Sequence, residues 1–279
     1  MSQIIVSLST IPPRFGQIQP ALSSLLEQST RADRVLLFIP DRYRRFPDWD
    51  GSLPEVPEGV EICRTADDLG PATKVLSAAR DFRGTDTEII FCDDDRVYPR
   101  DFIRDFLRTR ARRKGCAIAN IGFLAEVICP SSGRDRPQPA TVRSWRITDI
   151  DFQLRYLWNQ IRGGTRWREV EQPWRRVYKR SGFVDIFEGC AGVMVRPEFF
   201  TDEAYDIPPV LWTVDDVWLS GMLRKAGVGI WLRGNQFPPE ETDARHQSPL
   251  VKSIVDGADR HTANRMAVEY FQNTHGIWL

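Results

Sequence analysis

The sequence predicts an α/β fold in which helices flank a mostly parallel sheet. Short apolar runs rich in β-branched residues alternate with stretches of helical periodicity, and this alternation is typical of strand–helix units. In addition, the run Thr87–Cys92 leads directly into three adjacent carboxylates, Asp93, Asp94 and Asp95. Because open α/β sheets bind ligands beyond the carboxyl ends of their strands, this tract is the first candidate for a functional site.

The first half of the chain contains expected strands that are short apolar runs, each ending at a turn residue or a charge. They span residues 3–8, 34–40, 59–65, 87–92 and 116–124. Apolar residues at three- and four-residue spacing predict helices between them, one ending near Gln28 and two more at 67–82 and 101–114. Residues 41–58 contain several prolines and glycines and are expected to form a surface loop.

The alternation of strands and helices stops between residues 126 and 182. This segment is rich in arginine, proline, glycine and tryptophan, and long loops within a compact domain are commonly binding loops. Tryptophan faces stack on sugar rings and on nucleobases, although each could instead fill the core beneath the insertion. The tryptophans in question are Trp145, Trp158, Trp167 and Trp174.

Regular structure is expected again after this insertion. In order, the second half contains a strand from 183, a small-residue turn at 189–192, a strand, a helix from Pro197, a helix from Asp215 to a cap at Gly227, and a strand at 229–232. The tail that follows is polar and only weakly periodic, so no element is assigned to it.

The composition argues against several classes of protein. Lys plus Arg and Asp plus Glu both number 38, so the formal net charge is zero and no broadly basic nucleic-acid surface is indicated. The five cysteines are scattered without a C-x-x-C pair, which argues against a disulfide framework or a zinc site. No apolar run approaches the roughly 20 residues that span a bilayer, and the first residues lack a signal-peptide pattern. We therefore expect a cytoplasmic protein, with peripheral membrane association left open.

The three adjacent acids allow two interpretations. In an extended chain the side chains alternate, so Asp93 and Asp95 would point one way and Asp94 the other. Two carboxylates on one side could share a hard divalent cation, which would leave Asp94 the more replaceable residue. The alternative is an acidic turn after a strand, without any ligand.

Two further segments are candidates for the same site. The turn from Asp67 to Lys74 leads into a helix, so its backbone amides and the lysine could receive a phosphate or a nucleotide, although a Gly-Pro helix start is also a common structural feature. Asp215 and Asp216 open another helix. Acids at that position are stabilised by the helix dipole, and an ionised carboxylate there could equally serve as a general base.

Taken together, five segments in sequence order resemble the GT-A-fold, nucleotide-sugar-dependent glycosyltransferases, and among them the inverting, family 2-like kind. The resemblance covers roughly residues 1–125 and 183–232. Its landmarks are VSLSTIPPRF, DLGPATK, IIFCDDD, EGCAGVMVRPEFF and an Asp-Asp pair with Ala-Gly eleven residues later. Asp216 falls at the position of the family's catalytic acid or base, with Arg224 and Gly227 in step.

This resemblance implies the fold and the reaction. It implies a single GT-A (Rossmann-like) domain over 1–279, with a nucleotide-sugar-binding half at 1–125, a Trp/Arg-rich acceptor-side insertion at 126–182, and an acceptor and catalytic half with the C-terminal tail at 183–279. The implied reaction moves a sugar from a nucleoside-diphosphate donor to a hydroxyl of a carbohydrate or glycolipid acceptor, with inversion and with Mn²⁺ or Mg²⁺, as in polysaccharide biosynthesis.

The same resemblance gives each candidate residue a role. Asp95 would coordinate the metal, with Asp93 near the metal or the ribose, and Asp216 would activate the acceptor with support from Asp215. The residues implied in donor binding are Thr10, Pro12, Arg14, Asp68, Lys74, Asp93 and Asp94. Enzymes of this kind frequently have a metal-binding histidine in the C-terminal part, for which His246 is the first candidate and His261 the second.

Alternative functions remain open at this point. A retaining GT-A transferase needs no base at Asp216, and a sugar-phosphate nucleotidyltransferase would be expected to have a glycine-rich loop where this chain has Pro12-Pro13-Arg14. A non-catalytic sugar- or nucleotide-binding scaffold would keep its function after Asp95→Asn. The pair Asp215-Asp216 also replaces the family's commoner Glu-Asp, so the sequence does not decide which acid is the base.

Overall fold

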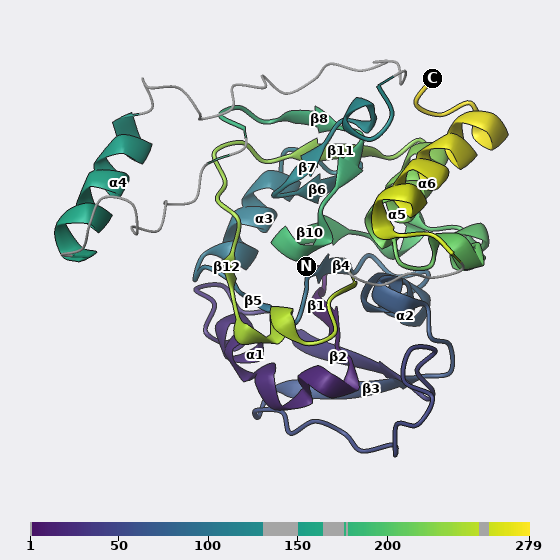
Figure 1. Cartoon of the computed structure of the whole chain (residues 1–279), viewed down its shortest axis with the longest axis horizontal. Coiled ribbons are helices and arrows are strands. Elements are labelled where there is room, and N and C mark those ends of the chain that lie inside the picture. The colour runs from purple at the N-terminus through teal and green to yellow at the C-terminus, as the bar shows by residue number, and fades with distance from the viewer. Residues whose placement is uncertain (1, 131–149, 164–175, 177, 251–256) are drawn as a thin grey trace.

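A computed structural model describes residues 2–130, 150–163, 176, 178–250 and 257–279. It confirms the α/β fold class, because one eight-stranded, mostly parallel sheet lies between helices on both faces (Figure 1). Strands from both halves of the chain belong to this sheet, in the order β3-β2-β1-β4-β10-β6-β11-β8. The arrangement is consistent with a Rossmann-like GT-A fold.

The strands of the main sheet are short and largely buried. They are β1 (Ile4–Ser9), β2 (Arg34–Pro40), β3 (Val60–Thr65), β4 (Glu88–Phe91), β6 (Cys116–Ala119), β8 (Gly182–Val184), β10 (Val193–Val195) and β11 (Gly229–Leu232). Two small two-stranded sheets complete the strands described. They pair β5 (Arg96–Val97) with β12 (Glu240–Glu241), and β7 (Gly122–Phe123) with β9 (Ile186–Phe187).

The helices differ in length and in the face of the sheet that they cover. They are α1 (Gln19–Leu26), α2 (Thr73–Asp81), α3 (Phe102–Arg110), α4 (Ile150–Gly163), α5 (Asp215–Lys225) and α6 (Arg260–His275). Short 3-10 turns shape the loops. Those around the site are η1 (Pro12–Gln17), η2 (Gly70–Ala72), η4 (Gly189–Ala191) and η8 (Asp243–His246).

Strand direction explains where the site lies. The strands β3, β2, β1 and β4 run parallel to one another, and β11 runs parallel to β6. The strand β10 runs antiparallel to both β4 and β6, and β8 runs antiparallel to β11. The other six strands therefore point the same way, and their carboxyl ends meet at one edge of the sheet.

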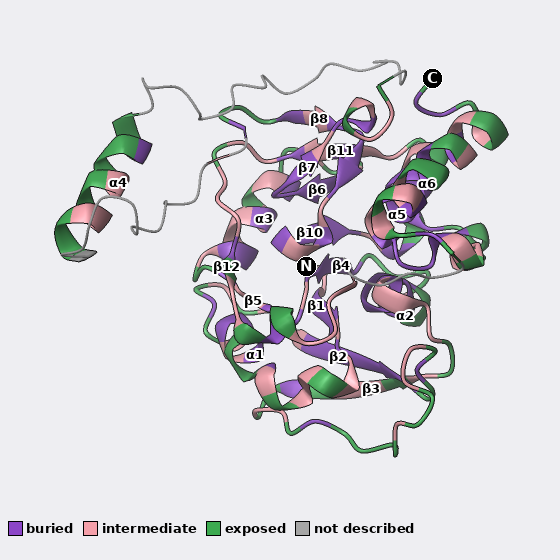
Figure 2. Cartoon of the chain, in the orientation of Figure 1, coloured by how far each residue is buried: buried purple, intermediate pink, exposed green. Residues whose placement is uncertain are grey.

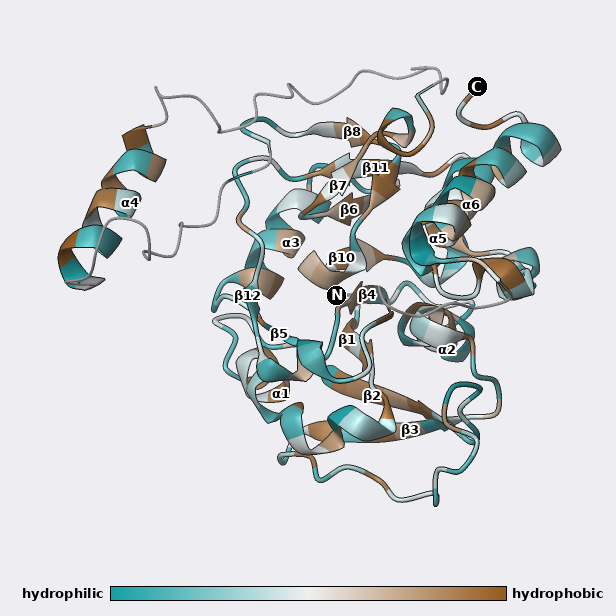
Figure 3. Cartoon of the chain, in the orientation of Figure 1, coloured by the Kyte–Doolittle hydropathy of each residue, from teal (hydrophilic) through white to brown (hydrophobic). Residues whose placement is uncertain are grey.

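Two hydrophobic clusters hold the helices to the sheet. Along β1 the buried side chains alternate, so that Ile5 belongs to one cluster and its neighbour Val6 to the other. The first cluster packs α2, α5 and α6 on one face, and the second packs α1 and α3 on the opposite face. Figure 2 shows the strands buried between these layers, and Figure 3 shows their apolar character against the polar outer faces of the helices.

Several predicted elements differ from the structure. The run 116–124 is not one strand, because the chain leaves the main sheet at Asn120, whose side-chain amide donates to the carbonyl of Ala191 at 2.9 Å. The strand expected from 183 is likewise interrupted at Asp185, whose carboxylate accepts the Ala125 N–H at 3.0 Å. The helix expected at Pro197 is only a 3-10 turn of three residues.

Helix α6 lies in the polar tail, where no element was predicted. Its start is capped by Asp259, whose carboxylate accepts the Thr262 N–H at 2.8 Å. Ala263, Ala267 and Phe271 are buried at four-residue spacing and pack into the first cluster, where Phe271 contacts the ring of Trp218. This helix was not predicted from the sequence, because the buried stripe is narrow and most of the helix surface is polar.

The predicted insertion contains helix α4, which lies at the left of Figure 1, apart from the helices that cover the sheet. Trp158 on this helix is exposed, whereas Trp145, Trp167 and Trp174 lie outside the described residues. Arg155 connects α4 to the segment after β11, with its guanidinium 4.4 Å from the centre of the Phe237 ring. None of the helices that the structure describes is both long and apolar enough to span a bilayer.

Candidate active site

A cavity of about 620 Å³ lies at the carboxyl edge of the sheet, between β1, β4 and the first turns of α2 and α5. The predicted residues that line it are Thr10, Arg14, Asp68, Lys74, Asp93, Asp94, Asp95, Asp215, Asp216 and His246. Pro12 and His261 are not among the lining residues; Pro12 begins the turn η1, and His261 is exposed on α6. Residues from the two halves of the chain therefore meet in one cavity.

The acidic tract is a turn, not an extension of the strand. β4 ends at Phe91, and the residues that follow bend back toward β5. The hydroxyl of Tyr98 accepts the backbone N–H of Asp93 at 2.9 Å and donates to the carbonyl of Cys190 at 3.0 Å, which ties the tract to the turn η4. The expected alternation of side chains is therefore wrong here, because it requires an extended backbone.

Asp94 is the most deeply held of the three acids. It is 3% exposed, and its carboxylate accepts the Thr10 hydroxyl at 2.5 Å and Arg14 Nη1 at 2.6 Å. These contacts fix the loop after β1 against the end of β4. The expectation that Asp94 points away from the site is wrong, because this residue lines the cavity; that it is replaceable stays an untested prediction. Thr10 and Arg14 reach the cavity as predicted, but their contacts are to this carboxylate.

Asp95 is held more loosely. Its Oδ2 lies 3.2 Å from Arg14 Nη1, and its buried Oδ1 has no hydrogen-bond partner, with Arg96 Nε at 3.4 Å. Burial, followed by the charges of Asp93 and Asp94, raises the pKa of Asp95 to about 6. A buried carboxylate oxygen without a hydrogen bond favours binding of a cation.

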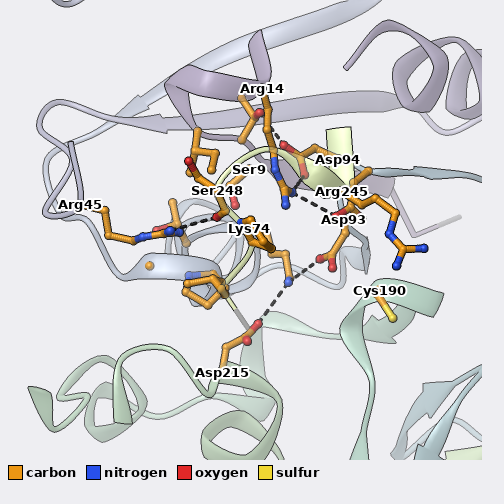
Figure 4. Close-up of a pocket in the computed structure, with 18 of the residues that line it drawn as sticks. Ser9, Arg14, Arg45, Lys74, Asp93, Asp94, Cys190, Asp215, Arg245 and Ser248 are labelled. Atoms are coloured by element: carbon orange, nitrogen blue, oxygen red, sulfur yellow. Dashed lines mark hydrogen bonds and ion pairs between the residues drawn. The ribbon is translucent and has the colours of Figure 1, made fainter. Parts of the chain in front are cut away.

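Lys74 lies between the acidic tract after β4 and the acid pair at the start of α5. Its Nζ lies 2.6 Å from Asp93 Oδ1 and 3.1 Å from Asp215 Oδ2, as the dashed lines in Figure 4 show. Burial alone would lower the pKa of Lys74, but the carboxylates of Asp215, Asp93 and Asp216 raise it well above its ordinary value. Burial opposes ionisation of Asp93, yet Lys74 holds the pKa of Asp93 below its usual value. The lysine is therefore charged.

Asp216 occupies a different environment from its neighbour Asp215. Asp216 is half-buried in the cavity wall, and its Oδ1 accepts the Gly189 N–H at 2.9 Å. A Cβ at Gly189 would lie 3.0 Å from that oxygen, so the glycine permits this close contact. Burial and the adjacent Asp215 raise the pKa of Asp216 well above its ordinary value, which suits a group that takes up a proton.

The Gly-Pro turn is braced by side chains. Asp68 accepts the backbone N–H groups of Arg44 at 2.7 Å and of Gly70 at 2.9 Å, and the Thr73 hydroxyl accepts the Leu69 N–H at 3.1 Å. The Leu69 and Gly70 amides of the turn are therefore already bonded to side chains, which leaves fewer of its amides for a phosphate than expected. Asp68 still lines the cavity.

Sequence reasoning missed Arg45, which lines the cavity from the loop 41–58. Its Nη2 donates to the carbonyl of Ser248 at 2.9 Å, and no carboxylate of the described residues lies within ion-pair distance of it. Burial and the like charge of Arg14 lower the pKa of Arg45. The sequence feature that could have indicated Arg45 is the stretch of arginines among aromatic residues at 42–46. The same stretch is equally typical of an exposed loop.

Other missed residues come from the second half of the chain. They are Glu188, Cys190, Trp212, Glu241, Arg245, Arg260 and Asn264. Burial raises the pKa of Glu188. Arg260 and Asn264 lie on α6, so they could be found only once this helix was recognised from its small-residue stripe.

The predicted metal ligands do not form a ready-made cluster. Across residues 2–130, 150–163, 176, 178–250 and 257–279, no three His, Cys, Asp or Glu side chains are arranged to hold a metal ion. Asp93 is bonded to Lys74, and His246 is an exposed residue of the turn η8. Asp95, whose Oδ1 has no hydrogen bond, could instead serve as the single carboxylate ligand of a cation. Such a cation would take its other ligands from water and phosphate.

Comparison with known proteins assigns neither a family nor an activity. No family model and no curated protein matches the chain. Among solved structures, the chain is similar to TarS of S. aureus, with 12% sequence identity and a TM-score of 0.42. The similarity covers 85% of this chain but only 36% of TarS, so this chain spans about a third of that protein's length.

Proposed function

We propose that this protein is a glycosyltransferase that moves a sugar from a nucleoside-diphosphate donor to a hydroxyl of a carbohydrate or glycolipid acceptor. One observation carries the proposal. The acidic tract at the end of β4 and the acid pair at the start of α5 line the same cavity, and Lys74 lies between them. Such a cavity offers one end that can hold a charged leaving group and another that can activate an incoming hydroxyl.

In the proposed reaction Asp216 is the general base. Its Oδ1 is fixed by the Gly189 N–H, which leaves the rest of the half-buried carboxylate to accept the proton of the acceptor hydroxyl. The oxygen then attacks the anomeric carbon as the bond to the diphosphate breaks. Attack on the face opposite the leaving group gives inversion. Asp215 is ion-paired with Lys74 and supports Asp216 without taking the proton itself.

We also propose a divalent cation, Mn²⁺ or Mg²⁺, bound by Asp95 together with diphosphate oxygens. When bound, such an ion offsets the charge that develops on the leaving diphosphate. The unbonded Oδ1 of Asp95 supports this assignment. Arg14 and Arg96, which flank Asp95, would hold this carboxylate in place as the donor binds.

Arg45 would bind the diphosphate directly. A guanidinium has five N–H donors, and the described contacts of Arg45 use one of them, on the carbonyl of Ser248. Because a half-buried cation with no carboxylate of the described residues at ion-pair distance is destabilised, an anionic ligand at this position offsets that cost. A planar guanidinium also matches two phosphate oxygens at once.

Replacing Arg45 with Gln is expected to weaken binding of the matching nucleoside diphosphate about 10- to 100-fold, the value of a hydrogen bond to a charged group. Binding of the nucleoside without phosphates should not change. Isothermal titration calorimetry with both ligands measures the difference. Arg42→Gln, an exposed arginine of the same loop, is the matched control. Equal losses for nucleoside and diphosphate would contradict the assignment.

The function is tested by ligand-dependent thermal stability. UDP, GDP, ADP, CDP and dTDP are each added with and without Mn²⁺, and one of them is expected to raise the melting temperature only with the metal, because ligands stabilise the state that binds them. Turnover of the corresponding nucleotide sugar, with NMR of the product's anomeric configuration, distinguishes an inverting from a retaining enzyme. No stabilisation by any nucleotide and no turnover would overturn the proposal in favour of a scaffold.

A further inference from the structure

The side chain of Lys74 is enclosed by the groups that join the two halves of the cavity. The residue is 5% exposed, and the hydroxyl of Ser7 on β1 donates to its backbone carbonyl. Its Nζ lies between Asp93, which follows β4, and Asp215 on the first turn of α5 (Figure 4). A Cβ at Gly189 would lie 3.4 Å from Nζ, so the turn η4 closes another side.

These contacts leave few N–H donors of the Lys74 ammonium available to a ligand. An ammonium has three N–H donors, and two carboxylates lie at hydrogen-bonding or ion-pair distance from this one. In addition, the buried Oδ2 of Asp215 has no hydrogen bond and depends on Lys74 as its counterion. The lysine is thus already used by the protein, in contrast with Arg45.

We propose that Lys74 is a positioning residue that fixes the donor-side Asp93 and the acceptor-side acid pair relative to each other, and that it does not bind the diphosphate. This inference rests on the proposed function and replaces the expectation that Lys74 is a donor ligand. Asp216 follows Asp215 directly on the first turn of α5, so holding Asp215 also fixes where the base lies. Without the ammonium, the half-buried Asp93 and the buried Asp215 would face each other as like charges.

The experiment separates positioning from binding by measuring affinity and turnover in the same variants. The variants are Lys74→Met, Lys74→Arg, Asp215→Asn and the double variant Lys74→Met/Asp215→Asn. The probe is the nucleoside diphosphate that stabilises the wild type, measured by calorimetry with Mn²⁺, and turnover is followed with its nucleotide sugar. The double variant and Asp215→Asn differ only in Lys74. The double variant removes one acid together with the cation, so we expect it to fold even if Lys74→Met alone does not.

The proposal predicts a split between kcat and binding. Lys74→Met should lower kcat about 100-fold, the cost of misplacing a reacting group by about 1 Å. Lys74→Arg should recover at least about tenfold of that loss, because it restores the cation between the two acids. The double variant should bind the nucleoside diphosphate within about twofold of Asp215→Asn, a difference well below one hydrogen bond.

Two results would overturn the inference alone. One is a loss of nucleotide affinity of about 10- to 100-fold in the double variant relative to Asp215→Asn, as expected of a direct phosphate contact. The other is wild-type turnover in Lys74→Met. By contrast, a wild-type protein that neither binds a nucleotide nor turns over a nucleotide sugar would overturn the proposed function, and this inference with it.

Discussion

Replacing Asp216 with Asn is expected to lower sugar transfer by about 10²- to 10⁴-fold, the usual contribution of a general base. The amide cannot take the proton of the acceptor hydroxyl. Its oxygen can still accept the Gly189 N–H, so the turn η4 and the start of α5 should keep their structure. Nucleotide affinity and melting temperature should therefore match those of the wild type, while turnover of the nucleotide sugar is lost.

The pH dependence of turnover provides a second readout for Asp216. The base is active as the carboxylate, and its pKa is raised above the ordinary value of 3.8 by burial and by Asp215. Wild-type turnover should therefore rise with pH along an acidic limb above pH 3.8, and Asp216→Asn should lack this limb. Asp86→Asn, an exposed aspartate remote from the cavity, is the control. Wild-type turnover in Asp216→Asn would exclude this residue as the base.

Replacing Asp94 with Ala is expected to destabilise the protein by about 3 kcal/mol, the cost of breaking a buried ion pair by removing one partner. The substitution leaves the Thr10 hydroxyl without its acceptor and removes the closer of the two carboxylates on Arg14. For a chain of this size, that loss corresponds to a melting temperature lower by about 6 to 12 °C. Thermal and urea unfolding, both without nucleotide, measure it.

Asp95→Ala is the matched comparison, because it removes the neighbouring acid. Its loss of stability should be smaller, since the Asp95 carboxylate lies 3.2 Å and 3.4 Å from its arginine partners and is crowded by two other acids. However, it should abolish the Mn²⁺-dependent stabilisation by nucleotide. The reverse ranking, with Asp94→Ala as stable as the wild type, would show that the contacts of Asp94 with Thr10 and Arg14 contribute little to stability.

Much of the fold is predictable because each buried strand is marked by a short apolar run in the sequence. An apolar run that ends at Pro40 or at an acid predicts a strand whatever surrounds it, and β1, β2, β3 and β4 agree with their predicted ranges within one residue at each end. The reversed direction of β10 is not a local property. It depends on the turn η4, where Gly192 adopts a φ of 89° and leaves no room for a Cβ beside the Phe102 ring.

The candidate site, like the fold, was predicted only in part from the sequence. Residue type and order bring the acids of β4 and α5 to one edge of the sheet, since parallel strands share their carboxyl ends. Side-chain direction within the acidic tract was predicted wrongly, because the alternation rule applies to an extended backbone and these residues form a turn. Arg45 was missed because only the three-dimensional structure places it in the cavity wall with no carboxylate of the described part of the chain at ion-pair distance.

By itself the sequence determined the α/β class, most strand positions and the acids that line the cavity. Hydrophobic periodicity and strand ends depend only on residues that are neighbours in the sequence. Only the tertiary structure decided which charges pair. Lys74 and Asp215 are far apart in sequence and lie 3.1 Å apart in the fold. Charge pairing depends on distances between segments, and the packing of the fold sets these distances. The roles proposed for Lys74 and Arg45 depend on this pairing.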